Sequence, residues 1–189
     1  MSRRSQAEEV LEIALIGDLS DCEADVTQKL LEVPPGGECS LYFDCPGGSP
    51  YSGLSVTSLI LMRGLRVTGI VTGECSSAAL WPFAACCRRI VTPYSVLLFH
   101  PMKWQSEEHV GLLEAAEWAR HFGRLEEDMD QLLADLLGMS REKIDPWMRP
   151  GKYVGGPEFA AEGMAELVTL GALPDIARNG AARRGKQRS

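Results

Sequence analysis

The sequence predicts an α/β fold built on a largely parallel sheet. Apolar segments of strand length alternate with segments of helical spacing, and glycine and proline clusters separate them. The first such segment, LEIALIGDL at 11–19, has the apolar character of a buried strand. The length of 189 residues fits one domain with a sizeable core. Strands and helices that alternate at such short spacing favour parallel pairing of the strands.

The first half of the chain contains three predicted strands and two predicted helices. Ser20 and Asp21 follow the first strand, and both residue types cap helix starts. The cluster Pro34-Pro35-Gly36-Gly37 ends the first helix. In chain order we expect a strand at 11–19, a helix at 22–33, a strand at 40–45, a helix at 52–64 closed by its last glycine, and a strand at 66–72.

The second half of the chain is predicted to be mainly helical. Its longest helix carries an apolar stripe at three- and four-residue spacing, from Leu112 to Leu136, and Gly138 stops it. In chain order we expect a helix at 78–87, strands at 89–92 and 95–100, the long helix at about 107–137, a short helix from 140 towards 148, and a helical turn at 157–162.

The net charge of the chain limits the kinds of partner it can bind, and the uneven distribution of charge indicates how the chain is organised. A net charge of −7 argues against nucleic acid as the main partner. The last twelve residues carry five positive charges, so residues 1–177 carry about −12. We therefore predict a short N-terminal extension at 1–10, a folded domain at 11–175, and a basic, disordered tail at 176–189.

No membrane or secretion signal is evident in the sequence. The polar N-terminus lacks the apolar core of a signal peptide, and no apolar run is long enough to span a bilayer. We therefore predict a cytoplasmic protein whose six cysteines are reduced thiols. The cysteine spacings match no zinc pattern, and only three histidines accompany them. No metal or cofactor is expected.

The segment VTGECSSAAL at 71–80 carries the clearest chemical signal. A β-branched strand leads into Gly73, and a small-residue helical pattern begins at Ala78. The turn between them places Ser76 or Ser77 at a helix start, where free N–H groups and the helix dipole stabilise a developing oxyanion. Two interpretations are open: one serine is a nucleophile, or both serines only cap the helix.

Three segments are expected to meet at the carboxyl ends of the parallel strands, where such sheets bind ligands. They are Pro46-Gly47-Gly48 after the second strand, the turn at 73–77 after the third, and His100 at the end of a later strand. Glycines without a Cβ let backbone N–H groups face a ligand. His100 near a helix-start serine is a candidate general base, and a structural histidine is the alternative.

Three separated motifs carry a family resemblance. They are YFDCPGG at 42–48, GECSSAA at 73–79 and PYSVLLFH at 93–100. In order and spacing they resemble the strand plus S-P-G-G, the G-x-A-(A/S)-S-M-G and the P-N-S-R-V-M-I-H of ClpP, the proteolytic subunit of the Clp protease (peptidase family S14). The similarity runs from about residue 13 to residue 170. The chain is therefore identified as a divergent member of the ClpP/crotonase superfamily.

The resemblance implies a repeated β-β-α superhelix with a long protruding handle helix. It also implies a serine endopeptidase that works inside an oligomeric chamber, with Ser77 as nucleophile and His100 as base. The backbone N–H groups of Gly47 and Ala78 would donate to the oxyanion. The implied substrates are peptides or unfolded proteins. The handle helix would join copies into a ring or stacked rings, with an AAA+ unfoldase or a ClpP paralogue as a possible further partner.

The sequence departs from the family pattern at the third member of the catalytic triad. A gap-free fit from residue 138 to residue 153 puts Trp147 where the family has aspartate. An indole only donates hydrogen bonds, so Trp147 cannot accept one from His100. Asp145 is the nearest acid and is our candidate for orienting His100. A backbone carbonyl, a water molecule, or no support at all are the alternatives.

Further departures leave two other functions open. Ala79 replaces a family glycine, Pro82 interrupts the nucleophile helix, and the segment after His100 lacks the family's glycine-rich strand. About ten residues precede the first strand, so the family's axial loops are largely missing. One alternative is a catalytically weak or inactive subunit that assembles with an active paralogue. The other is a crotonase-type acyl-CoA enzyme, although no acid–base carboxylate is evident at the helix start after the Gly73 turn.

Overall fold

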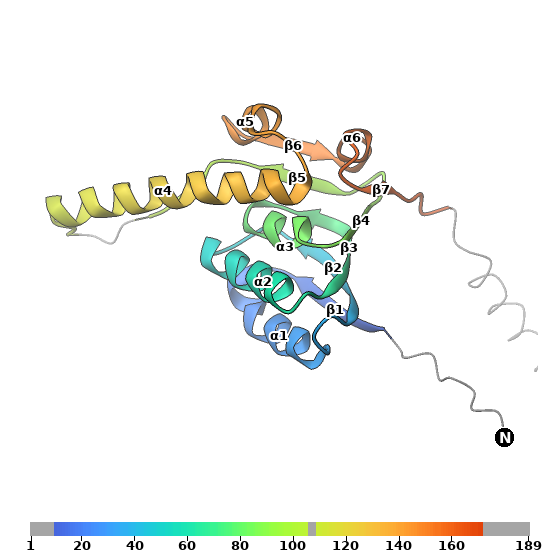
Figure 1. Cartoon of the computed structure of the whole chain (residues 1–189). Coiled ribbons are helices and arrows are strands. Elements are labelled where there is room, and N and C mark those ends of the chain that lie inside the picture. The colour runs from blue at the N-terminus through green and yellow to red at the C-terminus, as the bar shows by residue number, and fades with distance from the viewer. Residues whose placement is uncertain (1–9, 106–108, 172–189) are drawn as a thin grey trace, which may run out of the picture.

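The main sheet is parallel, as the sequence predicts. The structure is a computed structural model that describes residues 10–105 and 109–171 (Figure 1). The strand order is β1-β2-β3-β4-β7, and every neighbouring pair in this series is parallel. The strands are β1 (Leu11–Ile16), β2 (Glu38–Cys45), β3 (Arg66–Cys75), β4 (Arg88–Val91) and β7 (Glu166–Leu167).

Strand β3 continues beyond this sheet into a second, smaller layer. Near its end it pairs in parallel with β5 (Val96–Phe99), which pairs antiparallel with β6 (Lys152–Gly155). Sequence reasoning missed β6, because its residues KYVG have one buried apolar side chain, Val154, and lie among glycines that are typical of a loop. The β5–β6 pairing matters for function, since it brings the chain just after β5 next to the chain just before β6.

Three helices cover one face of the parallel sheet (Figure 1). They are α1 (Leu19–Glu32), α2 (Pro50–Met62) and α3 (Leu80–Ala84). Two of them begin earlier than predicted, because other residues cap them. Asp18 Oδ1 accepts the N–H of Ser20 at 2.8 Å, and Ser49 Oγ accepts the N–H of Tyr51 at 3.2 Å. Both helices therefore begin close to the glycine turn that follows β2.

The helix predicted at 78–87 is shorter than expected. A 3₁₀ turn, η1 (Ser77–Ala79), leads into the five residues of α3, all of which are buried. Pro82 is tolerated because it lies within the first turn of α3, where its missing N–H costs no helix bond. A short buried helix of small and aromatic residues therefore holds the preceding serine turn against the core.

The long helix α4 (Leu112–Leu137) is confirmed, with a start later than the predicted residue 107. Its second half packs on the body through Met129 and Leu133, whereas its first half projects away from it (Figure 1). Leu112 and Leu113, at the projecting end, are 86% and 87% exposed. Gly138 ends the helix with a φ of 69°, as the sequence predicts. The remaining helices are α5 (Arg141–Met148) and α6 (Gly156–Ala161).

A chain of aromatic rings joins the two layers. Phe83 of α3 lies 5.3 Å from Phe43 of β2 and 6.0 Å from Phe159 of α6, measured between ring centroids. Phe159 in turn lies 6.4 Å from Phe99 of β5. All four phenylalanines are buried, and burying a side chain of this size contributes about 1.5–3 kcal/mol. The strand ends that carry the site are therefore fixed by one continuous core.

Two parts of the predicted domain organisation cannot be compared with the structure. The basic tail at 176–189 and nearly all of the N-terminal extension lie outside the described residues, so the boundaries at 11 and 175 stay predictions. Across 10–105 and 109–171, no helix combines the length and the apolar character needed to cross a bilayer.

Candidate active site

Ser77 lies at a sharp turn directly after β3. Its φ is 53°, a left-handed conformation that costs a non-glycine residue about 1–3 kcal/mol. Such strain persists only where surrounding structure enforces it, and it is common at active sites. The Ser77 side chain is half-buried and lines a pocket of about 200 Å³. The turn therefore presents a hydroxyl to a cavity at the carboxyl end of the sheet.

His100 follows β5 and lines the same pocket as Ser77. Two segments of the chain that are distant in sequence thus meet at this pocket. No hydrogen bond joins the Ser77 hydroxyl to the imidazole within the described residues, and such contacts are often long in enzymes without substrate. The other residues lining the pocket are Gly48, Pro50, Ala78, Trp81, Met102 and Lys103.

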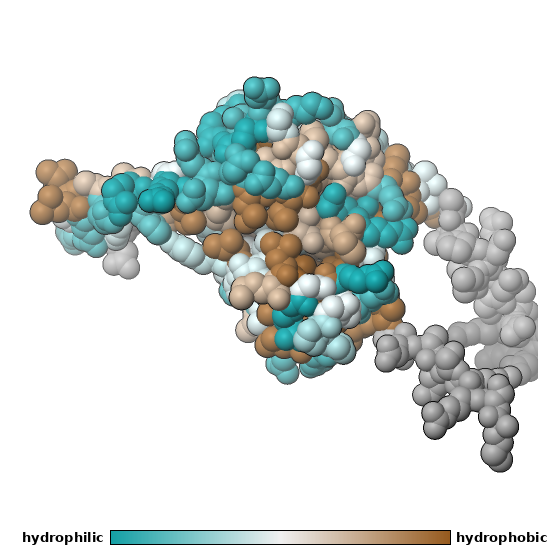
Figure 2. All heavy atoms as spheres, in the orientation of Figure 1, coloured by the Kyte–Doolittle hydropathy of each residue, from teal (hydrophilic) through white to brown (hydrophobic). Residues whose placement is uncertain are grey.

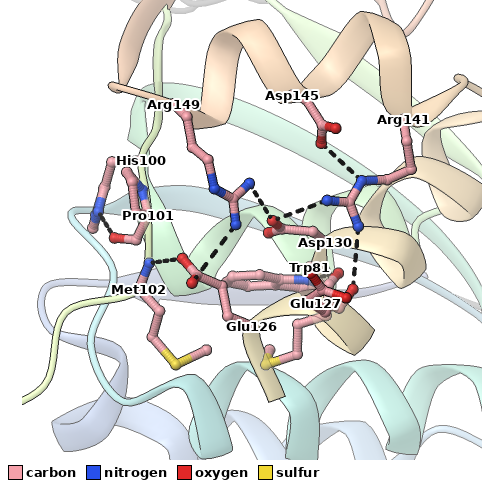
Figure 3. Close-up of polar contacts among 11 residues, drawn as sticks. Trp81, His100, Pro101, Met102, Glu126, Glu127, Asp130, Arg141, Asp145 and Arg149 are labelled. Atoms are coloured by element: carbon pink, nitrogen blue, oxygen red, sulfur yellow. Dashed lines mark hydrogen bonds and ion pairs between the residues drawn. The ribbon is translucent and has the colours of Figure 1, made fainter. Parts of the chain in front are cut away.

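The imidazole of His100 is held by the next residue in the chain. Its Nδ1 lies 2.6 Å from the carbonyl oxygen of Pro101 (Figure 3). A carbonyl oxygen only accepts hydrogen bonds, so Nδ1 carries the proton in this contact. Nε2 of the neutral ring then has a free lone pair. His100 is therefore in the tautomer that a general base requires.

Ser76 has a structural role. It is fully buried, and its hydroxyl donates to Glu74 Oε1 at 2.6 Å while accepting from the N–H of Leu98 at 3.2 Å. Its own N–H donates to the carbonyl of Cys45 at 3.0 Å. These bonds tie β3 to β5 and β2, and Ser76 makes no capping bond with its side chain. Of the two serines, Ser77 is the one that lines the pocket.

The glycine turn after β2 lies directly against Ser77. Gly47 has a φ of 110°, and a Cβ at this position would lie 2.6 Å from Ser77 Cβ and 2.9 Å from the carbonyl oxygen of Ser76. Real Cβ atoms do not approach other atoms so closely, so a larger residue would displace the nucleophile or the turn. Position 47 therefore requires a glycine, because only a residue without a Cβ fits against Ser77.

The backbone N–H of Gly47, one of the two expected oxyanion donors, is directed to a neighbouring sulfur. It points to Cys45 Sγ at 3.4 Å, and the Gly47 carbonyl accepts from Leu19 N–H at 2.7 Å. Gly48 lines the pocket, and its N–H has no hydrogen-bond partner among the residues that the structure describes. Ala78, the other expected donor, also lines the pocket. Neither the Gly48 N–H nor the Ala78 N–H has a hydrogen-bond partner among the described residues, so both are candidate donors.

Gly151, rather than Trp147, lies beside His100. The β5–β6 ladder pairs Phe99 with Lys152, and a Cβ built on Gly151 would lie 3.3 Å from His100 Cβ. Trp147 belongs to α5 and packs edge-on against Phe99, with ring centroids 5.2 Å apart. The gap-free sequence fit did not include the β5–β6 pairing, which decides the neighbour of His100. A glycine there offers no carboxylate to the imidazole.

The structure does not bring Asp145 to His100. Asp145 Oδ1 accepts from Arg141 Nε at 2.8 Å, one turn earlier on α5 (Figure 3). The i,i+4 spacing on a helix explains this pairing, because it places the two side chains on one face. His100 Nδ1 is occupied by the Pro101 carbonyl. The nearest acid in sequence therefore serves the arginine of its own helix.

A network of charged side chains lies behind His100 (Figure 3). Asp130 of α4 is 1% exposed and accepts from Arg149 Nη1 at 3.0 Å and Arg141 Nη2 at 3.5 Å. Burial raises the pKa of the Asp130 carboxyl, and the hydrogen bond from Arg149 opposes that rise. Glu126, one turn earlier, lies 3.6 Å from Arg149 Nη2 through Oε2. Sequence reasoning missed this network, because pairs so far apart in sequence leave no local pattern.

The buried cysteines of β2 are structural. All six cysteines of the chain are free thiols in the structure. Burial raises the pKa of Cys39 and of Cys45 to about 11, so both remain protonated near neutral pH and are poor nucleophiles. In the described parts of the chain, no group of three His, Cys, Asp or Glu side chains could hold a metal ion.

Comparison with known proteins places this geometry in a family. A family model described as Clp protease matches residues 6–170, most of the chain. The chain belongs to the Clp protease family. An ATP-dependent Clp protease proteolytic subunit of Bacteroides fragilis is 29% identical over 124 residues, which are 61% of this chain and 59% of that subunit. The proteolytic subunit 3 of Synechococcus sp. (strain CC9605) is 31% identical over 131 residues, 68% of this chain and 64% of that subunit.

The fold agrees with this family assignment. A solved structure of a ClpP1 point mutant from Listeria monocytogenes superposes with a TM-score of 0.73 at 19% sequence identity, covering 84% of this chain and 91% of that one. At that identity the likeness shows the Clp protease fold and no more. The aligned part of the chain spans 59% of the length of the Bacteroides fragilis relative.

Proposed function

We propose that this member of the Clp protease family is a serine endopeptidase in which Ser77 is the nucleophile and His100 the general base. The observation that carries the proposal is that a serine held at a φ of 53° and a histidine with a free Nε2 line one pocket. The family supports it, because the relatives are described as proteolytic subunits of an ATP-dependent protease.

The proposed reaction follows from these positions. Nε2 of His100 takes the proton of the Ser77 hydroxyl as Oγ attacks the carbonyl carbon of the peptide. The resulting imidazolium gives that proton to the leaving amine, and the acyl group stays on Ser77. Water then attacks the ester with His100 again as base, which releases the acid and restores the free hydroxyl. Each step uses only groups of the protein, the peptide and water.

We assign the oxyanion to the N–H groups of Ala78 and Gly48. Ala78 is the second residue of the 3₁₀ turn, where first-turn N–H groups have no partner within the helix. Gly48 lines the pocket and its N–H has no partner among the described residues, whereas the Gly47 N–H is directed to a sulfur. Donors fixed in place before the reaction stabilise the developing charge without reorganisation.

We further propose that the site is a Ser–His dyad supported by a backbone carbonyl. The Pro101 carbonyl fixes the His100 tautomer, which is one of the two tasks of a triad carboxylate. Gly151, which lies against the Cα and Cβ of His100, has no side chain, and Asp145 is paired with Arg141. The second task, stabilising the imidazolium, then falls to a neutral carbonyl dipole. We therefore expect a slower enzyme than one with a full triad.

A fluorophosphonate probe tests the nucleophile. Wild-type protein is expected to be labelled at Ser77, as mapped by mass spectrometry, and the Ser77→Ala variant is expected to take no label. Ser76→Ala is the matched control: it removes two buried hydrogen bonds, so it should lower stability by about 1–3 kcal/mol while labelling persists. An unlabelled wild-type protein would instead support an inactive subunit or an acyl-CoA enzyme.

We also propose that the chain assembles with copies of itself through α4. Leu112 and Leu113 lie almost fully exposed on the projecting half of this helix, and Figure 2 shows apolar surface at its tip. Exposed apolar groups of this size favour an interface. A ring or stacked rings would enclose the peptidase sites, and peptides, an AAA+ unfoldase or a ClpP paralogue would be its partners. The cytoplasmic location stays a prediction.

Light scattering at micromolar concentration tests the assembly. We expect a mass several times that of the 20.7 kDa chain. The double variant Leu112→Glu and Leu113→Glu should shift the mass toward the monomer, because charges at a buried interface are costly. Met62→Glu is the control, since Met62 is 87% exposed on α2. A monomeric wild-type protein would exclude the ring.

A further inference from the structure

A single peptide group connects His100 to a carboxylate on α4. The Pro101 carbonyl accepts from His100 Nδ1 at 2.6 Å, and the N–H of Met102 donates to Glu126 Oε1 at 2.8 Å (Figure 3). The carbonyl of Pro101 and the N–H of Met102 belong to the same planar trans peptide, with the two groups on opposite sides. Three hydrogen-bonding groups therefore lie in series: imidazole, peptide, carboxylate.

We propose that Glu126 is a positioning residue for His100 and replaces the triad acid through this peptide group. The inference rests on the proposed function. A carboxylate bound to the N–H side of an amide fixes the plane of the peptide, so the carbonyl points at His100 Nδ1. Polarisation along such a chain of bonds also strengthens each member, by roughly 10–30% per bond. The carbonyl thus supports an imidazolium better than an isolated one would.

Glu126 is held in place for this role. Arg149 Nη2 lies 3.6 Å from Glu126 Oε2, the oxygen that does not bind Met102, and Arg149 Nη1 donates to buried Asp130 at 3.0 Å. The Glu126 side chain is 23% exposed, so water screens it only partly. Arg149 also lies two residues before Gly151, which lies against the Cα and Cβ of His100. The ion pairs therefore fix the carboxylate and the two chain segments that flank the histidine.

Because position 151 has no side chain, His100 lacks a carboxylate in direct contact in the described part of the chain. The series of imidazole, peptide group and Glu126 carboxylate, here called the relay, takes its place. A triad acid contacts the imidazole directly, and no carboxylate within the described residues bonds to His100. Glu126 acts on His100 Nδ1 through the peptide group between Pro101 and Met102. The charge is not transferred, and no proton moves along the peptide: the carboxylate orients and polarises it.

The test compares Glu126→Ala and Glu126→Gln with Glu127→Ala. Glu127 is the adjacent exposed acid, and its side chain makes no hydrogen bond in the described structure, so it matches the change in charge. In Glu126→Ala, kcat for a peptide substrate should fall about 10- to 100-fold, as for a lost hydrogen bond to a charged group, while KM stays within about twofold. Glu126→Gln keeps an acceptor oxygen and should recover part of the loss. Glu127→Ala should behave as wild type.

Two readouts separate this inference from the proposed function. The rate of fluorophosphonate labelling should fall in Glu126→Ala by the same factor as kcat. The low-field proton resonance of the His100 Nδ1–H, assigned by its loss in His100→Ala, should shift in Glu126→Ala and stay in place in Glu127→Ala. Wild-type labelling with an unchanged kcat in Glu126→Ala overturns the relay and leaves the peptidase intact. If the wild-type protein is not labelled, the proposed peptidase function is wrong. If the His100 Nδ1–H resonance also stays in place in Glu126→Ala, the proposed role of Glu126 is wrong as well.

Discussion

Replacing Ser77 or His100 by alanine is expected to lower kcat/KM by at least about 10³-fold, and the double variant should lose no more than either single one. The reason is that the two side chains form one catalytic unit: without the base the hydroxyl stays protonated, and without the hydroxyl the base has nothing to activate. Both variants should keep their fold, because both side chains line a pocket and neither belongs to the buried core. Steady-state kinetics of the three variants measure this effect.

Asp145→Asn is the control for that series. Asp145 pairs with Arg141 on α5, where its side chain is 46% exposed, so its charge is expected to matter little for turnover. An activity within about threefold of wild type would agree with the dyad. A loss comparable to that of His100→Ala would show that Asp145 reaches the imidazole during catalysis, and would restore the triad that the sequence suggested. Additive losses in the Ser77 and His100 double variant would contradict a shared mechanism.

The fold was largely predictable because its signals are local. Strands such as 11–16 and 38–45 are short segments with buried apolar residues at alternate positions, bounded by turns, and α4 has a clear apolar stripe. The errors in the predicted secondary structure lie where tertiary contacts determine the length or the existence of an element. The helix after Ser77 is cut to a few residues by its burial in the core, and β6 exists only because β5 lies beside it. Neither feature has a pattern in its own residues.

The candidate site also has a part that local sequence motifs predict and a part that depends on tertiary contacts. Ser77 and His100 could be predicted to meet because one lies in the turn after a predicted strand, the other ends a predicted strand, and both sit in spaced motifs. The partner of the imidazole is a backbone carbonyl, which the sequence left as one of several alternatives, since backbone groups are the same in every residue and no pattern marks the one that accepts. Gly151 and Glu126 lie 51 and 26 residues beyond His100 and are brought to it by the β5–β6 ladder and by α4. The gap-free fit therefore chose the wrong neighbour.

Gly47→Ala is expected to lower kcat by about 10²-fold or more although Gly47 touches no substrate in the proposed mechanism. A methyl group there would meet Ser77 Cβ at 2.6 Å and the Ser76 carbonyl at 2.9 Å. The nucleophile turn or the glycine turn must then move, and a misplacement of about 1 Å is enough for a loss of this size. The φ of 110° adds backbone strain.

Gly36→Ala separates these two causes. Gly36 also has a positive φ, 74°, but no atom lies within 4 Å of the position of an added Cβ. Both alanine variants should lose roughly 1–2 kcal/mol of stability from the left-handed backbone. Activity should fall only in Gly47→Ala, because only there does the methyl group meet the nucleophile. Thermal unfolding and peptide kinetics, measured on both variants, decide the matter. If the two lose activity equally, strain alone accounts for the effect, and the contact between the glycine turn and Ser77 has no part in catalysis.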